Sequence, residues 1–404
     1  MKFLKIILLL IPASLHAQTW VVFVHGTIGG TLALYHVNEI KKNNVLDGSS
    51  YARQVERYRK KELNSKDRLL LDYGLIPIPT HVPAHFLDQK FDPALPEYGA
   101  YVIVGAFDSL MQQVGYLHQD IRYFTFGWSG LLSQRHRQIA GFDLYNALCN
   151  ARDAQEEKPI IIVVGYSHGG NVPLWFEEAE HYFKRNLEID TLITLGCPLQ
   201  VETVFATASP VFKHIYTIRS DGDLVPQADR ISTQVGKSSA RLHDFLNPAE
   251  LNAANNRHVC DIRILVNGNI KSVDHRSFFN LCYKKKILPE LSGLPFLMFI
   301  PHILPILHAN PNWSNMDLHL NVDAVRHAMQ IAWSEYQSPV IKAASDNIYP
   351  HFCRVRSLTD QYWSSRIVKS GDDLTPLDNI LLLPATVTLQ TESLIDRLRN
   401  GSKA

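Results

Sequence analysis

The stretch VVGYSHGGNVP, residues 163–173, places one serine between a hydrophobic run and a pair of glycines. Its centre, GYSHG, fits the pattern G-x-S-x-G, in which a strand enters a sharp turn and a helix leaves it. The apolar run IIIVV (160–164) enters the turn, and apolar residues with helical spacing follow from Val172 to Phe183. Glycines leave room for a nucleophile in a strained turn. This context favours Ser167 as a nucleophile over a small residue that merely suits a turn.

Short apolar runs recur along the chain and predict strands that are covered on both faces, because their apolarity is continuous rather than alternating. Helices are expected between them, including one near Ala100–Val114 and one after Ser167 that Pro173 should bend. We therefore predict an α/β fold with a doubly wound, mostly parallel sheet. The predicted strands are WVVFV (20–24), RYFTF (122–126), IIIVV (160–164), TLITL (191–195), HIYTI (214–218) and IRILV (262–266).

A serine nucleophile needs a base and a group that orients the base. For the base, His275 lies in the loop after the last predicted strand. His243 and His258 precede or begin that strand and are expected to face elsewhere. For the acid, SDGDLVP (220–226) offers Asp221 and Asp223, and each could instead cap an ordinary Asp-Gly turn.

The segment FVHGTIGG (23–30) ends the first predicted strand with a glycine-rich turn. We expect the backbone N–H groups of Thr27 and His168 to bind the oxyanion that develops during acyl transfer. The alternative is a phosphate-binding loop through the same glycines. It is weaker, because the spacing fits neither G-x-G-x-x-G nor a P-loop with its lysine.

With these segments in this order, the sequence resembles the α/β-hydrolase superfamily over roughly residues 20–30 and 100–280. HGTIGG resembles its oxyanion segment, GYSHGG its nucleophile elbow, and ITLGCP (193–198) the strand end that follows. SDGDLVP resembles the D-x-V-P acid segment of secreted fungal-type triacylglycerol lipases, which assigns the acid to Asp223. The resemblance implies a serine hydrolase of carboxylic esters, a lipase or esterase, with the triad Ser167, Asp223 and His275 and no metal or organic cofactor.

The predicted catalytic domain covers residues 18–308, with an insertion or cap at 31–95 after the first strand. The apolar segment at 288–308 contains LSGLPFLMFIPHILPIL (291–307) and is either a lid or an irregular part of the core. Its prolines argue against a regular membrane-spanning helix. A C-terminal extension of unknown role is expected at 309–404.

Within the expected extension, residues 321–337 carry apolar side chains at three- and four-residue intervals and predict a helix. His319 lies near Asp317 and Asp323, which suggests a metal site, but we expect this polar stretch to be a solvated surface and predict no metal.

The N-terminus, MKFLKIILLLIPASLHA (1–17), reads as a secretion signal: two lysines, a short apolar run, a proline and a small final residue. The alternative is a first core strand. We expect export to the periplasm or the extracellular space, with peripheral contact to membranes or lipid. Five cysteines are too few for a disulfide scaffold. In an exported protein Cys260 and Cys282 could form one bridge, but we favour buried free thiols.

The chain has 404 residues, with 40 Lys and Arg against 39 Asp and Glu, so its net charge of +1 gives no field that would favour nucleic acid. The expected substrate is a small-molecule or lipid ester, cleaved through an acyl-enzyme. Two alternatives remain: a non-catalytic binding protein with the α/β-hydrolase fold, or an amidase or thioesterase that uses the same triad.

Overall fold

The structure is a computed structural model, and the following describes the residues that it places. They are 18–28, 35–41, 48–63, 72–79, 99–114, 120–204, 206, 209–229, 232–233, 237–241, 244–245, 258–271, 273–278, 295–309, 315–323, 325–343 and 347–357. The predicted signal at 1–17 and the end of the chain from 358 lie outside these residues.

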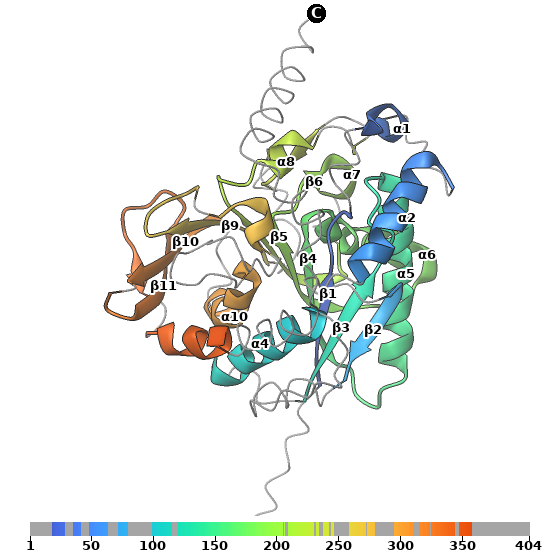
Figure 1. Ribbon diagram of the computed structural model, residues 1–404. Coiled ribbons are helices and arrows are strands. Elements are labelled where there is room, and N and C mark those ends of the chain that lie inside the picture. Colours follow the sequence, from blue (N-terminus) through green and yellow to red (C-terminus); the bar gives the residue numbers. More distant parts are fainter. Residues whose placement is uncertain are drawn as a thin grey trace, which may run out of the picture.

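One mostly parallel sheet forms the centre of the molecule (Figure 1). In the described residues its strands follow the order β12-β11-β10-β9-β7-β5-β4-β1-β3-β2. Neighbouring strands from β10 to β3 are parallel, whereas β2, β11 and β12 are antiparallel to the strands beside them. The strands are β1 (Thr19–Val24), β2 (Gly74–Ile78), β3 (Ile121–Gly127), β4 (Ile160–Tyr166), β5 (Ile189–Leu195), β7 (Phe212–Arg219), β9 (His258–Val266), β10 (Asn315–Asp323), β11 (Ala328–Glu335) and the two-residue β12 (Lys342–Ala343). A separate pair is formed by β6 (Leu199–Gln200) and β8 (Ser238–Ser239).

Both faces of the sheet are covered, which explains the continuous apolar runs. In β1, Val21 and Phe23 belong to one buried cluster, whereas Trp20 and Val22 belong to the other. Helices α4 (Gly99–Val114) and α10 (Ile300–His308) pack on the first face, and α5 (Gln134–Asp153) and α6 (Phe176–Phe183) pack on the second (Figure 1). All six predicted strands and the helix near 100–114 are present. The prediction of an α/β fold with a mostly parallel sheet is confirmed.

The expected insertion after β1 contributes to the sheet and to its cover. Its described residues form α1 (Val37–Lys41), α2 (Ser50–Leu63) and the edge strand β2. Tyr51 and Val55 of α2 lie in a small apolar cluster with Leu131 and Leu132 of the loop after β3. Helix α2 is therefore packed against the chain that leads into α5.

The helix predicted over 321–337 is wrong, because this segment contains most of the β10–β11 hairpin. Met316, Leu318, Leu320 and Val322 alternate with polar residues along β10, and all four belong to the apolar cluster on one face of the sheet, as the period of two in a strand requires. The hairpin and β12 continue the sheet. Strands β10, β11 and β12 of the expected C-terminal extension are therefore part of the central sheet.

The expectation of a solvated surface around Asp317 and His319 is also wrong. Both residues lie in β10 and are buried. Arg263 of β9 donates two hydrogen bonds to the Asp317 carboxylate at 2.8 and 2.7 Å, and His319 contacts the Ser334 hydroxyl at 3.1 Å. This carboxylate is therefore paired with a guanidinium.

The apolar segment that we considered as a lid is described from residue 295 onward. Its residues form a short turn, η8 (Phe296–Phe299), followed by α10, and residues 296–304 are all buried beside α4. In this arrangement the segment is part of the core, and its role as a lid stays a prediction. The described helices include none that is both long and apolar enough to cross a membrane.

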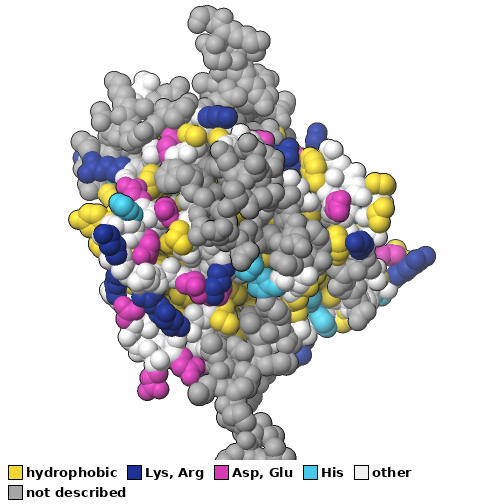
Figure 2. Space-filling view, turned by 180° about the vertical axis from the view of Figure 1, so that it is seen from behind, with side chains coloured by type: hydrophobic (Ala, Val, Ile, Leu, Met, Phe, Trp, Pro, Cys, Tyr) yellow, Lys and Arg dark blue, Asp and Glu magenta, His cyan; other side chains and the backbone are white. Residues whose placement is uncertain are grey.

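The described thiols Cys149, Cys197 and Cys260 are free and buried, and Cys282 lies outside the described residues. On the face seen in Figure 2, the Lys and Arg side chains of the described residues are interspersed with those of Asp and Glu.

His302 of α10 gives the fold a testable dependence on pH. Burial and the neighbouring His351 lower the pKa of His302 from 6.5 to about 4. Between these two values the unfolded chain takes up a proton that the folded chain does not, so the free energy of unfolding falls as the pH falls from 6.5 to 4. Leucine at this position takes up no proton. The free energy of unfolding of His302→Leu, measured relative to that of wild type by denaturant unfolding, should therefore be about 2 kcal/mol higher at pH 5 than at pH 8.

The control for this measurement is Ile303→Val, at the next buried position of the same helix. It should lose about 1 kcal/mol, equally at both pH values. A difference between His302→Leu and wild type that did not depend on pH would contradict the prediction.

Candidate active site

Ser167 lies at the turn where β4 ends and a short helical turn, η2 (Ser167–Asn171), begins. Its φ is 52°, the left-handed conformation that strains a residue with a side chain. A Cβ added to Gly165 would lie 2.6 Å from Gly170 Cα, and one added to Gly169 would lie 2.2 Å from the His25 carbonyl oxygen. The glycines therefore permit the close approach of strand and turn that holds Ser167 in place.

The segment after the turn is bent, as Pro173 predicts. In place of one continuous helix, η2 is followed by a second short turn, η3 (Pro173–Trp175), and then by α6. The apolar residues still reach the sheet, because Val172, Phe176 and Ala179 are all buried.

The predicted base and acid lie beside Ser167 in one chain of hydrogen bonds. The Ser167 hydroxyl is 2.9 Å from His275 Nε2, and His275 Nδ1 is 2.8 Å from Asp223 Oδ2. Because a carboxylate accepts, Nδ1 carries the proton and donates to Asp223, and Nε2 is left to accept from the hydroxyl. The Asp223 side chain is 1% exposed and that of His275 is 18% exposed. The imidazole can thus reach a bound molecule while its acid is shielded from water.

The sheet explains why residues so distant in sequence meet. Ser167 follows β4, Asp223 follows β7, and His275 begins a short turn, η6 (His275–Phe278), after β9. These strands are parallel, so their carboxyl ends lie at one edge of the sheet. His258 begins β9 and therefore lies at the opposite edge, whereas His243 is outside the described residues.

Backbone and aromatic contacts hold the acid and the base. Val225 N–H donates to Asp223 Oδ1 at 3.0 Å, which orients the other oxygen toward His275. The Tyr166 hydroxyl donates to the His275 carbonyl at 3.0 Å, and the two rings are 5.0 Å apart between centroids. Sequence analysis missed Tyr166, because its partner is 109 residues away.

Asp221 has other partners. Its carboxylate accepts from Arg219 at 2.5 Å and from Arg263 at 3.4 Å. We therefore expect Asp223→Asn to lower kcat by roughly 10³- to 10⁴-fold, because the amide no longer enforces the imidazole tautomer. Asp221→Asn should change kcat by less than about tenfold. Steady-state kinetics of the two variants test the assignment, and the reverse order would transfer the role to Asp221.

The glycine-rich segment after β1 lies directly against the nucleophile. A Cβ added to Gly26 would be 2.8 Å from Ser167 Cβ. The neighbouring His25 is fixed by Trp128, whose indole N–H donates to the His25 carbonyl at 2.7 Å and whose backbone N–H donates to His25 Nε2 at 3.2 Å. Thr27, a predicted oxyanion donor, follows Gly26. In the described structure its hydroxyl oxygen is buried without a hydrogen-bond partner.

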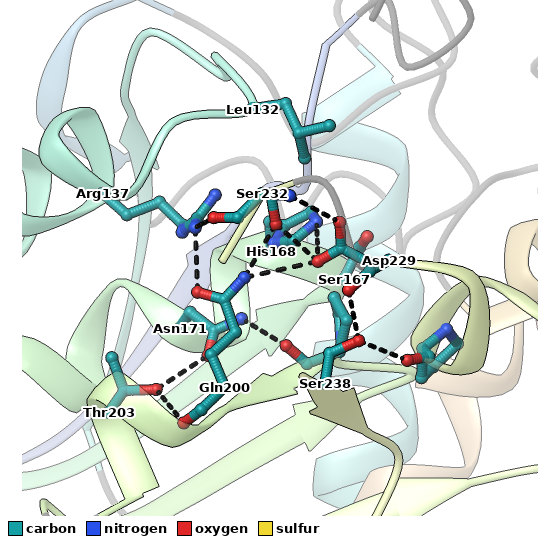
Figure 3. Close-up of polar contacts among 12 residues, drawn as sticks. Leu132, Arg137, Ser167, His168, Asn171, Gln200, Thr203, Asp229, Ser232 and Ser238 are labelled. Atoms are coloured by element: carbon teal, nitrogen blue, oxygen red, sulfur yellow. Dashed lines mark hydrogen bonds and ion pairs between the residues drawn. The ribbon is translucent and has the colours of Figure 1, made fainter. Parts of the chain in front are cut away.

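His168, the other predicted oxyanion residue, is 3% exposed, and its imidazole Nε2 is 3.3 Å from Asp229 Oδ2 (Figure 3). Burial, Arg137 and His275 lower the pKa of His168 well below its ordinary value. His168 is therefore neutral under conditions in which a histidine of ordinary pKa begins to charge. No motif indicated Asp229 as the partner of His168.

The described residues contain no group of three or more His, Cys, Asp or Glu side chains arranged to bind a metal ion. Comparisons of the chain with protein-family models, curated proteins and solved structures found no match.

Proposed function

We propose that this protein is a serine hydrolase with the α/β-hydrolase fold that cleaves carboxylic esters. The observation that carries the proposal is the hydrogen-bonded chain from Asp223 through His275 to Ser167, with Ser167 held at φ 52° between a buried strand and a helical turn. A strained turn and two uninterrupted hydrogen bonds are what an activated serine requires.

In the proposed mechanism, Ser167 Oγ attacks the carbonyl carbon of the ester while His275 Nε2 takes the hydroxyl proton. The backbone N–H groups of Thr27 and His168 stabilise the oxyanion. The Thr27 hydroxyl, which is buried without a hydrogen-bond partner in the described structure, is a further candidate donor. His275 then gives its proton to the leaving alcohol, which leaves an acyl-enzyme. Water activated by the same imidazole attacks this ester and releases the acid. Asp223 remains ionised and holds the imidazole throughout.

The order of the elements supports the fold part of the proposal. The chain presents nucleophile, acid and base in the order Ser, Asp, His, each in the turn or loop that follows a parallel strand of the same sheet. This order is that of the α/β-hydrolases and differs from the order in chymotrypsin or subtilisin.

We further propose a lipophilic ester as the substrate. Leu224 and Val225, directly after the acid, are 46% and 37% exposed. Exposed apolar side chains beside a catalytic group favour contact with acyl chains or a lipid surface. Export also belongs to the proposal. It rests on residues 1–17, which are outside the described residues.

The test is covalent labelling with a fluorophosphonate, followed by intact mass and peptide mapping. We expect one phosphonyl group per chain, attached to Ser167. A series of p-nitrophenyl esters from acetate to palmitate, with a matched anilide and thioester, then identifies the bond and the chain length. A folded protein that remains unlabelled would overturn the proposal and favour a non-catalytic binding role. Labelling with turnover of only the anilide or the thioester would reassign the reaction.

A further inference from the structure

A buried polar cluster adjoins the turn at Ser167 through His168, the next residue in the chain. It comprises Arg137, His168, Gln200, Asp229 and Ser232, which are all 7% exposed or less (Figure 3). They come from the first turn of α5, the turn after the nucleophile, strand β6 and the chain after helix α8 (Val225–Ala228). The mechanism proposed above leaves these side chains without a role.

The Asp229 carboxylate is the centre of this cluster. Ser232 Oγ and Gln200 Nε2 donate to its Oδ2 at 2.5 and 3.3 Å, and Ser232 N–H donates to Oδ1 at 3.3 Å. His168 Nε2 is 3.3 Å from the same Oδ2. Since the carboxylate can only accept and His168 is neutral, His168 carries its proton on Nε2 and donates it to Asp229.

Arg137 holds the donors in place. Its Nη2 donates to Gln200 Oε1 at 2.8 Å and to the Ser232 carbonyl at 2.9 Å. Both of those residues in turn bind Asp229. Burial raises the pKa of Asp229 above its ordinary value, and the hydrogen bond from Ser232 and the charge of Arg137 oppose this rise. Arg137 thus holds Asp229 indirectly, through its hydrogen bonds to Gln200 and Ser232, and directly through its positive charge.

Burying this cluster lowers the stability of the fold relative to an apolar core of the same size. A buried ion pair is often no more stable than apolar residues of similar volume. In the described structure, Arg137 Nε, Arg137 Nη1 and His168 Nδ1 are buried without hydrogen-bond partners, and each such atom costs about 1–3 kcal/mol. Costs of this kind concentrate at functional sites.

We propose that Asp229, held by Arg137, anchors the His168 side chain and so fixes the His168 backbone N–H as an oxyanion donor. This inference rests on the proposed function, and Asp229 and Arg137 are positioning residues within it. The peptide between Ser167 and His168 follows a residue with φ 52°, so relaxation of the turn would rotate this N–H. The hydrogen bond from the His168 imidazole to Asp229 opposes that rotation, because it holds the side chain of the residue whose backbone N–H would rotate.

The experiment compares Asp229→Asn, His168→Leu and His168→Gln with wild type. A glutamine places its Nε2 donor near the position of the histidine Nε2, whereas leucine fills the space without a donor. Burst titration with a p-nitrophenyl ester counts active sites, so kcat is measured per folded, competent molecule. The affinity for an aryl trifluoromethyl ketone, whose adduct carries an oxyanion, reports the oxyanion site directly.

We expect His168→Leu and Asp229→Asn to lower kcat per active site by roughly 10- to 100-fold, because a donor displaced by about 1 Å loses much of its effect. KM should change little, and the ketone should bind more weakly by the same factor as kcat/KM falls. His168→Gln should recover most of the loss. Asp153→Asn, a surface carboxylate that pairs with Arg185, should match wild type in every measurement.

A kcat per active site like that of wild type in both His168→Leu and Asp229→Asn would overturn the inference and show a purely structural cluster. Equal losses in His168→Gln and His168→Leu would also overturn it, as would a rise in KM alone. Should Asp229→Asn fail to fold, the two His168 variants decide. If wild type itself shows neither burst nor labelling, the proposed function has failed and this inference falls with it. That result differs from an active wild type whose variants keep the same kcat, which would overturn this inference alone.

Discussion

Ser167→Ala is expected to abolish ester turnover and fluorophosphonate labelling together. Without Oγ there is no atom to form the acyl-enzyme, and loss of the serine in a comparable triad lowers kcat by on the order of 10⁶-fold. The loss should appear in kcat with an intact fold, because alanine keeps the Cβ that packs near Gly26. Progress curves with a short-chain p-nitrophenyl ester and intact mass after labelling measure both effects.

Ser50→Ala is the control for this variant, since Ser50 is exposed at the start of α2, in the insertion. It should retain labelling and turnover. The thermal unfolding midpoint of Ser167→Ala should stay within a few degrees of wild type. Labelling that persisted in Ser167→Ala would identify a different nucleophile and remove the basis of the proposed mechanism.

His275→Ala is expected to lower kcat nearly as far, again by on the order of 10⁶-fold, because a hydroxyl at its ordinary pKa is a poor nucleophile without a base. The Ser167 hydroxyl is 2.9 Å from His275 Nε2. Among the described residues, no other histidine forms a hydrogen bond with this hydroxyl. The labelling rate should fall with kcat, since phosphonylation uses the same base. Stopped assays over hours with excess enzyme give the sensitivity that this measurement needs.

His258→Ala is the matched control, because β9 begins at this residue and His275 follows the other end of the strand. It should keep most of the activity of wild type. Because Ser167, His275 and Asp223 act as one unit in the proposed mechanism, the double variant Ser167→Ala/His275→Ala should be no slower than either single variant. Near-normal turnover in His275→Ala would show that the base has been assigned to the wrong residue.

The strands could be predicted, and the serine of the proposed triad could be placed in a turn after a strand, because both depend on local sequence. A run such as IIIVV is apolar on both faces, which only a covered strand requires, and G-x-S-x-G places its serine by steric rules within five residues. The choice of Asp223 over Asp221 depended on resemblance. In the structure Asp221 is paired with Arg219 and Arg263, whereas Asp223 contacts His275.

The failures have physical reasons. Residues 321–337 carry apolar side chains that fit a helical stripe, but the register with β9 and the alternation that begins at Met316 select a strand. Partners such as Tyr166 with His275, or His168 with Asp229, are joined only by the fold. A single sequence holds no signal for pairs that lie 61 or more residues apart and share no motif.

The interruption at Pro173 has an electrostatic consequence. In a continuous helix the peptide dipoles align and place a partial positive charge at the first turn. Here the peptides after Ser167 are divided among η2, η3 and α6, and proline has no N–H to contribute. The macrodipole available to an anion at Ser167 is correspondingly small. Neutralisation of that anion must come from individual amides in direct contact, and rates should therefore respond weakly to ionic strength.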